Sequence, residues 1–113
     1  MAAVVDWDTA LECVDGDREL LNDLARLFVE QIPAQVAKMH RVIDEGDGSA
    51  LSLCAHSVRG SAATLGAVVV CGTALALERL GEDGTLGEAA ALMPLIEAQL
   101  TELAAVLMQN SVT

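Results

Sequence analysis

The residues best suited to chemistry are a single histidine and a cation three positions later. His56 lies in the segment 51–67, LSLCAHSVRGSAATLGA, whose apolar residues recur at helical spacing and form one buried stripe. His56 lies roughly 100° around the helix from that stripe, and Arg59 follows on the next turn. A neutral imidazole can act as a nucleophile near pH 7, and a guanidinium can hold a dianionic group. The pair is therefore suited to attack on an activated anionic electrophile.

A glycine stands beside this histidine in the middle of the predicted helix. Gly60 costs about 1 kcal/mol relative to alanine there, and such a glycine usually marks a place where another surface comes close. We expect a partner protein to approach His56 over Gly60 and Ala63, with Ser52 and Leu53 on the adjoining turns. For Leu53, a partly buried position within the fold is an equal alternative.

Residue types alone leave a second interpretation of His56 open. A lone helical histidine is more often solvated or hydrogen-bonded than nucleophilic. The sequence contains no glycine-rich phosphate loop and no GxSxG motif. His40 and His56 lie on different predicted helices, and neither has a second ligand at metal-binding spacing. Hydrolytic and metal-dependent functions therefore have little support.

Composition predicts one helical domain with few anionic partners. The chain has 113 residues, of which 53% are hydrophobic, with one Trp, one Phe, no Tyr and two Pro. Its formal net charge of -11 argues against nucleic acid and anionic membranes as partners. No uninterrupted apolar run reaches the roughly 18 residues of a membrane span.

The N-terminus and the cysteines indicate a cytoplasmic protein. The first residues, MAAVVDWD, have no basic region and too short an apolar stretch for a secretory signal. An odd number of isolated cysteines suits a reducing compartment and a packing role; they are Cys13, Cys54 and Cys71.

Helix signals divide the chain into five segments. Capping-box spacing of Thr9 and Glu12 predicts a short helix over about 9–14, and Trp7 would cover one end of the core. Longer helices are predicted over about 18–45, 47–65, 67–80 and 85–109, and the first two of these have Asp17 and Asp47 as N-caps.

Prolines and glycines set the expected breaks. Pro33 predicts a kink in the helix over 18–45, although two helices meeting at Ile32 are a close alternative. Pro94 should kink or split the last helix near Met93, and residues 81–84 are predicted to form a loop. The buried face of the helix over 18–45 would contain Leu20, Leu21, Leu24, Leu27 and Phe28.

Four amphipathic helices with short connections predict an all-α, antiparallel four-helix bundle with a short additional N-terminal helix. We expect residues 1–113 to form a single domain whose ordered core covers about 7–109.

The histidine segment also resembles a known family. Residues 55–67, AHSVRGSAATLGA, are similar to the phosphoacceptor motif AHxLKGSAxxLGA of histidine-containing phosphotransfer domains. Val58 replaces the usual Leu, and the matching residues are Ala55, His56, Gly60, Ser61, Ala62, Leu65, Gly66 and Ala67. The resemblance extends over 11–21, 27–36 and 78–81, and so covers nearly the whole chain.

The resemblance implies that His56 accepts a phosphoryl group from, or returns it to, an aspartate of a response-regulator receiver domain. Arg59 stands where the family usually has a Lys that stabilises the phosphate, and Gly60 is the small residue that admits the receiver. Some members have a Gln that lies near the histidine from the next helix, and Glu78 stands at about that place, where it would pair with Arg59 or a neighbouring Arg and border the partner.

The implied protein is a phosphoryl carrier without kinase activity and with no cofactor of its own, since Mg²⁺ is expected in the receiver. Its partners would be a receiver domain or a hybrid histidine kinase, and we expect a monomer. A module that docks such a partner without carrying phosphate is the alternative.

Overall fold

The computed structural model describes residues 4–109, which fold into five helices and contain no strand. The helices are α1 (Trp7–Cys13), α2 (Arg18–Asp44), α3 (Gly48–Thr64), α4 (Val68–Asp83) and α5 (Leu86–Gln109).

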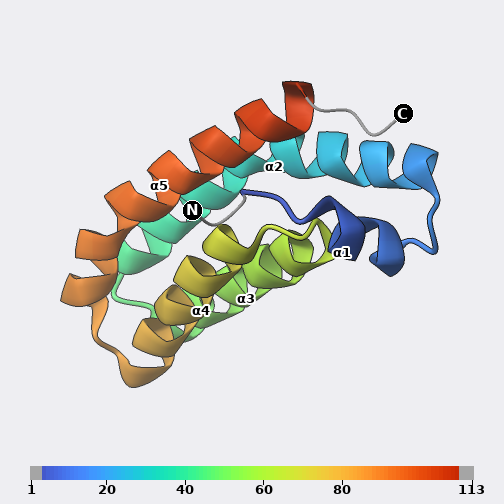
Figure 1. Ribbon diagram of the computed structural model, residues 1–113. Coiled ribbons are helices and arrows are strands. Elements are labelled where there is room, and N and C mark those ends of the chain that lie inside the picture. The colour runs from blue at the N-terminus through green and yellow to red at the C-terminus, as the bar shows by residue number, and fades with distance from the viewer. Residues whose placement is uncertain (1–3, 110–113) are drawn as a thin grey trace.

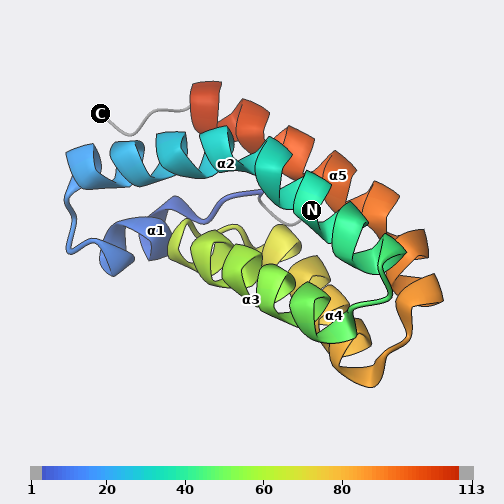
Figure 2. The same cartoon turned by 180° about the vertical axis from the view of Figure 1, so that it is seen from behind.

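The four long helices form an antiparallel bundle. α2 lies along α5, α3 lies along α4, and the two pairs pack together through α2–α3 and α4–α5 contacts (Figure 1). The short α1 covers one end, where it contacts α2 and α3 (Figure 2). The bundle measures 43 × 25 × 20 Å. The predicted fold class is confirmed.

Two of the predicted N-caps are confirmed by hydrogen bonds. The carboxylate of Asp17 accepts from the backbone N–H of Leu20 at 3.0 Å, and that of Asp47 accepts from Ala50 at 3.0 Å. Each cap satisfies one backbone donor that the first helical turn would otherwise leave unpaired. Asp47 therefore fixes where the helix that carries the histidine begins.

The predicted cap of the first helix was wrong. α1 begins at Trp7, and its N-cap is Asp6, whose carboxylate accepts from the N–H of Thr9 at 3.2 Å and from its hydroxyl at 2.9 Å. Thr9 has the right residue type for a cap, but Asp6 is three residues earlier and captures its donors.

The two prolines do not divide their helices. α2 is one helix through Pro33, and its axis bends around its middle (Figure 2). α5 is likewise one helix through Pro94, so of the predicted kink or split near Met93 the split is excluded. Each proline removes one backbone hydrogen bond from its helix. Because α2 and α5 pack against each other, this loss does not break either helix.

The C-terminal end of α4 was also predicted too early. Residues 81–83 were expected in a loop, but α4 continues to Asp83 and ends at Gly84, which has a φ of 73°. Gly81 is helical and lies against α3, because a Cβ there would be 2.7 Å from the Gly48 carbonyl oxygen and 2.8 Å from the Ser52 nitrogen. This glycine permits close approach of two helices and does not break one.

The predicted apolar stripe of α3 is confirmed, and all of its residues are buried: Leu51, Cys54, Ala55, Val58, Ala62 and Leu65. The buried face predicted for α2 was partly wrong, because Leu20 and Leu27 are 43% and 49% exposed while Leu21 and Phe28 are buried. α1 and α3 contact only one face of this end of α2, and Leu20 and Leu27 lie toward its solvent-exposed face.

Among the described residues, α5 is the one helix long and apolar enough to cross a membrane by length and composition. An 18-residue window of this helix has a mean hydropathy of 1.4. Glutamates nevertheless divide the helix into apolar runs that are each shorter than 18 residues. The helix packs against α2 and α4, and its buried residues are Ala89, Met93, Ile96, Leu100, Leu103 and Leu107. This is the one-sided burial of a helix that packs along the side of a bundle.

Candidate functional site

The structure brings His56 and Arg59 of α3 together around the carboxylate of Glu78 on α4. The Nδ1 atom of His56 lies 2.6 Å from Oε1 of Glu78. Arg59 donates from Nε to Oε2 of Glu78 at 2.9 Å and from Nη2 to Oε1 at 3.5 Å. Arg59 Nη2 also lies 2.9 Å from His56 Nδ1. Three charged or titratable groups therefore form one cluster across two helices.

The three side chains differ in exposure. The His56 side chain is 63% exposed and that of Arg59 is 32% exposed, whereas the Glu78 side chain is only 10% exposed. The carboxylate thus lies beneath the imidazole, and the imidazole is open to an approaching group.

Arg59 further stabilises the ionised form of the buried carboxylate. Its hydrogen bond is the largest influence on Glu78 and lowers the pKa of that carboxyl, while partial burial opposes the shift and the His56 contact adds to it. Because the pKa lies below its ordinary value of 4.5, Glu78 is ionised at neutral pH. The site therefore has a carboxylate balanced by a guanidinium.

The close packing of α3 on α4 sets this geometry. At the end of the pair, Gly48 and Gly81 allow the two backbones to approach, and one turn later Ser52 donates to Glu82 at 3.5 Å. Glu78 lies one turn before Glu82 on the same side of α4, and so meets His56 across the helix contact.

Gly60 and its neighbours lie on an open surface. A Cβ added at Gly60 would meet nothing within 4 Å, so no contact within the domain requires a glycine there. Ala63 is exposed, and Leu53 is 74% exposed, which excludes the partly buried alternative for that leucine.

The geometry does not favour the expected partner contact of Glu78. Its residue is buried, and both carboxylate oxygens already have partners within the domain. Ser52 is half-buried and directed at Glu82. The predicted pairing of Glu78 with Arg59 is present, and Glu78 also lies beside His56, where the resemblance to the family places a Gln from the next helix.

Comparison with known proteins identifies the family. The sequence matches the Hpt domain family over residues 23–106. The chain belongs to this family. It is a histidine phosphotransfer protein of phosphorelay signalling.

Two solved structures resemble this Hpt domain over almost their whole length. One is histidine-containing phosphotransfer protein B (HptB) from Pseudomonas aeruginosa PAO1, with 25% identity, a TM-score of 0.87 and coverage of 96% of this chain and 95% of the other. The second is the HPT domain of a sensor hybrid histidine kinase from Shewanella, with 15% identity, a TM-score of 0.80 and coverage of 94% and 92%. No curated protein sequence matches the chain.

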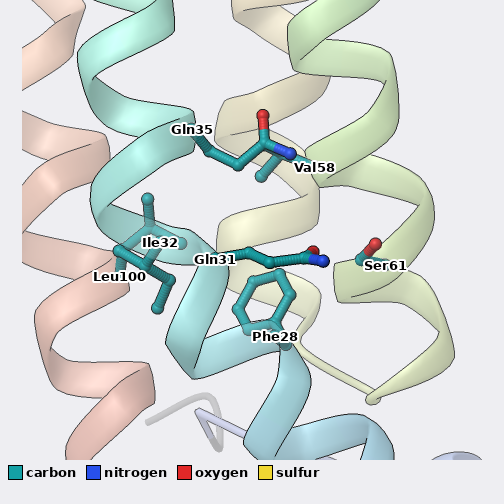
Figure 3. Close-up of a pocket in the computed structure, with 7 residues that line it drawn as sticks. All are labelled: Phe28, Gln31, Ile32, Gln35, Val58, Ser61 and Leu100. Carbon is teal, nitrogen blue, oxygen red and sulfur yellow. The ribbon is translucent and has the colours of Figure 1, made fainter.

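The Hpt domain also has a pocket that the sequence did not indicate. It lies between α2 and α3 and is lined by Phe28, Gln31, Ile32, Gln35, Val58, Ser61 and Leu100 (Figure 3). Gln31 and Gln35 extend from α2 toward α3, where Val58 and Ser61 lie (Figure 3). None of the predicted site residues lines it, and it contains no titratable group.

The described part of the Hpt domain contains no cluster of side chains suited to hold a metal ion. Across residues 4–109, no three His, Cys, Asp or Glu side chains are grouped as metal ligands would be. His40 lies away from the site and contacts Glu97 of α5 through Nε2 at 3.2 Å.

Proposed function

We propose that this Hpt domain carries the phosphoryl group on His56 and exchanges it with an aspartate of a receiver domain. The observation that carries the proposal is the exposed imidazole within the family motif, beside a guanidinium and on a surface kept open by Gly60.

The proposed exchange is an in-line displacement. A ring nitrogen of His56 uses its lone pair to attack the phosphorus of the receiver's acyl phosphate. A nitrogen–phosphorus bond forms, the bond from phosphorus to the aspartyl oxygen breaks, and that electron pair leaves with the carboxylate. The reverse displacement returns the group. Arg59 Nη2 lies 2.9 Å from the ring, so its positive charge stands beside a phosphoryl group bound there.

The receiver would cover the exposed surface of α3 around the histidine. Gly60 and Ala63 permit a close approach, and Leu53 offers an apolar contact.

The remaining chemistry would come from the partner. We propose that the domain has no cofactor and no kinase activity of its own, and that Mg²⁺ is held by the receiver. Its donor or recipient is a receiver domain, alone or within a hybrid histidine kinase. We place the protein in the cytoplasm as a monomer that binds neither nucleic acid nor membrane, in keeping with its net charge of -11.

Transfer of radiolabelled phosphate from a phosphorylated receiver tests the proposal. We expect label on the wild-type domain that is lost in acid and stable in base, and no label on a His56→Gln variant. His40→Gln is the matched control, because His40 is the second histidine of the chain and is also exposed. Label that persists on His56→Gln would contradict the proposal. A His56→Ala variant that binds and regulates the receiver normally would favour the docking module.

A further inference from the structure

Building on the proposed function, we propose that the docked receiver also contacts the outer face of α4, along a row of residues that we call the α4 ridge. The ridge consists of Val68, Gly72, Leu75 and Arg79, which recur at the i, i+4, i+7 and i+11 spacing of one helix face. Val68 is 62% exposed, Gly72 and Arg79 are exposed, and Leu75 is half-buried. The ridge is therefore a solvent-exposed surface next to α3.

The reacting atoms lie where α3 meets α4, and not over the middle of α3. The imidazole of His56 and the guanidinium of Arg59 lie 2.6 and 2.9 Å from the carboxylate of Glu78 on α4. A phosphoryl group on His56 beside Arg59 is therefore on the α4 side of α3. A receiver whose aspartate reaches this point is centred on both helices.

A protein interface is also wider than one helix. Even the smaller interfaces of transient signalling complexes bury about 600 Å² per partner, which corresponds to a disc about 14 Å in radius. A helix with its side chains is only about 10–12 Å across, so a disc centred on the reacting atoms extends beyond α3. At about 1.5 Å per residue, Gly72 lies about 9 Å along α4 from Glu78 and Val68 about 15 Å. Gly72 is therefore inside the disc, and Val68 is at its edge.

Gly72 is a second open glycine, comparable to Gly60. It lies inside α4, where alanine would be favoured, and a Cβ added there would meet nothing within 4 Å. The Sγ atom of Cys71 donates to the carbonyl oxygen of Arg59 at 3.8 Å, so this turn of α4 lies alongside the candidate site. The fold does not require a glycine at this position, but close approach of another protein to α4 would.

The charges of this surface complement the proposed partner. Residues 48–77 contain none of the 17 acidic residues of the chain, although its net charge is -11. The same stretch contains His56 and Arg59, and the exposed Arg79 ends the ridge. An aspartyl phosphate is anionic, and this stretch of α3 and α4 presents no acidic side chain to repel it.

A pair of glycine substitutions tests the inference in the transfer assay. Gly72→Gln adds a side chain to the α4 ridge. Gly87→Gln, the matched control, adds the same side chain to α5, which lies across the bundle from α3 (Figure 1). A Cβ at either position would meet nothing within 4 Å. At limiting receiver, we expect Gly72→Gln to take label at least about fivefold more slowly than wild type, and Gly87→Gln to keep the wild-type rate.

Phosphoramidate separates docking from the chemistry of His56. It phosphorylates histidine without a receiver: a ring nitrogen attacks phosphorus, the bond to the amine nitrogen breaks, and ammonia leaves with the electron pair. The inference is wrong if Gly72→Gln takes label from the receiver as fast as Gly87→Gln. It is also wrong if Gly72→Gln is slowed equally with both donors, because the glycine would then serve the fold.

Amide chemical-shift mapping tests the contact on the wild-type protein. The ¹⁵N-labelled domain is titrated with the unlabelled receiver domain from the transfer assay. We expect shifts at residues 68–75 as well as around His56. Shifts confined to α3 and to residues 24–35 of α2 would place the receiver on the other side of the histidine and overturn the inference.

The two proposals can fail separately. If the receiver labels His56 while residues 68–75 do not respond, the inference fails and the proposed function stands. If residues 68–75 respond to the receiver but His56 takes no label from it, the proposed function fails and the contact with α4 stands.

Discussion

Replacing Gly60 by alanine should stabilise the domain and impair its exchange with a receiver. The added Cβ would meet nothing within 4 Å, so the substitution introduces no steric cost inside the fold. Alanine is favoured over glycine in a helix interior by about 0.8–1 kcal/mol. At about 2.1 cal/mol/K per residue, the unfolding entropy of 113 residues is about 0.24 kcal/mol/K. The Tm should therefore rise by about 3–4 °C.

The same atom would lie on the surface offered to the partner. If a receiver packs on α3 at Gly60, the extra volume costs about 1–3 kcal/mol, or roughly five- to 150-fold in affinity. A larger side chain, as in Gly60→Gln, should lie at the upper end. Phosphorylation by phosphoramidate should stay at the wild-type rate, because so small a donor does not touch this position.

Calorimetry and receiver-dependent label transfer, measured on the same samples, show whether Gly60 serves the fold or the docking surface. A lower Tm for Gly60→Ala would show that the glycine serves the fold. A higher Tm with undiminished transfer in both variants would refute the assignment of Gly60 to the docking surface.

Two further outcomes concern the α3–α4 contact. Gly81→Ala should lower the Tm by about 4–8 °C, because its Cβ would lie 2.7 Å from the Gly48 carbonyl oxygen and the overpacking outweighs the gain in helix propensity. Gly72→Ala is the control on the same helix, and since it has open space around it, it should raise the Tm by about 3–4 °C. Equal Tm shifts of the two variants would contradict this prediction. Because the folded-state pKa of Glu78 is lowered, its contribution to stability is present above the ordinary value of 4.5 and is lost as the pH falls through the folded-state value. In urea unfolding between about pH 7 and pH 3, the wild type should lose more stability than Glu78→Gln, and parallel pH profiles would show that Glu78 adds nothing.

Much of the fold could be predicted from the sequence because its signals are local. The stripe on α3 and the caps Asp17 and Asp47 depend on residues within one or two turns, and all of them are confirmed. The errors have a different origin. Gly81 reads as a helix breaker in isolation, but it is the point where α4 meets Gly48 of α3, and that contact joins residues far apart in the chain.

In the candidate site, too, the local features could be predicted and the contacts between helices could not. The residue types at His56, Arg59 and Gly60 lie within two turns of one helix, so their shared surface could be predicted. Glu78 is 22 residues from His56, and its distance from Nδ1 depends on how two helices are aligned. The resemblance of Glu78 to the family's Gln position was the available signal, and it does not reveal which atom the carboxylate faces.

The order in which the helices pack also shapes how the chain can fold. α2–α3, α3–α4 and α4–α5 are neighbours in both sequence and space, so their contacts close short loops and can form early. α2 and α5 meet only after the chain has turned back on itself across both intervening helices. We therefore expect the α3–α4 hairpin, with His56 and Glu78 already facing one another, to assemble before α5 docks. Local opening of α5 from the native state would then leave the phosphorylation site formed, and amide exchange should be slower in α3 than in the C-terminal turns of α5.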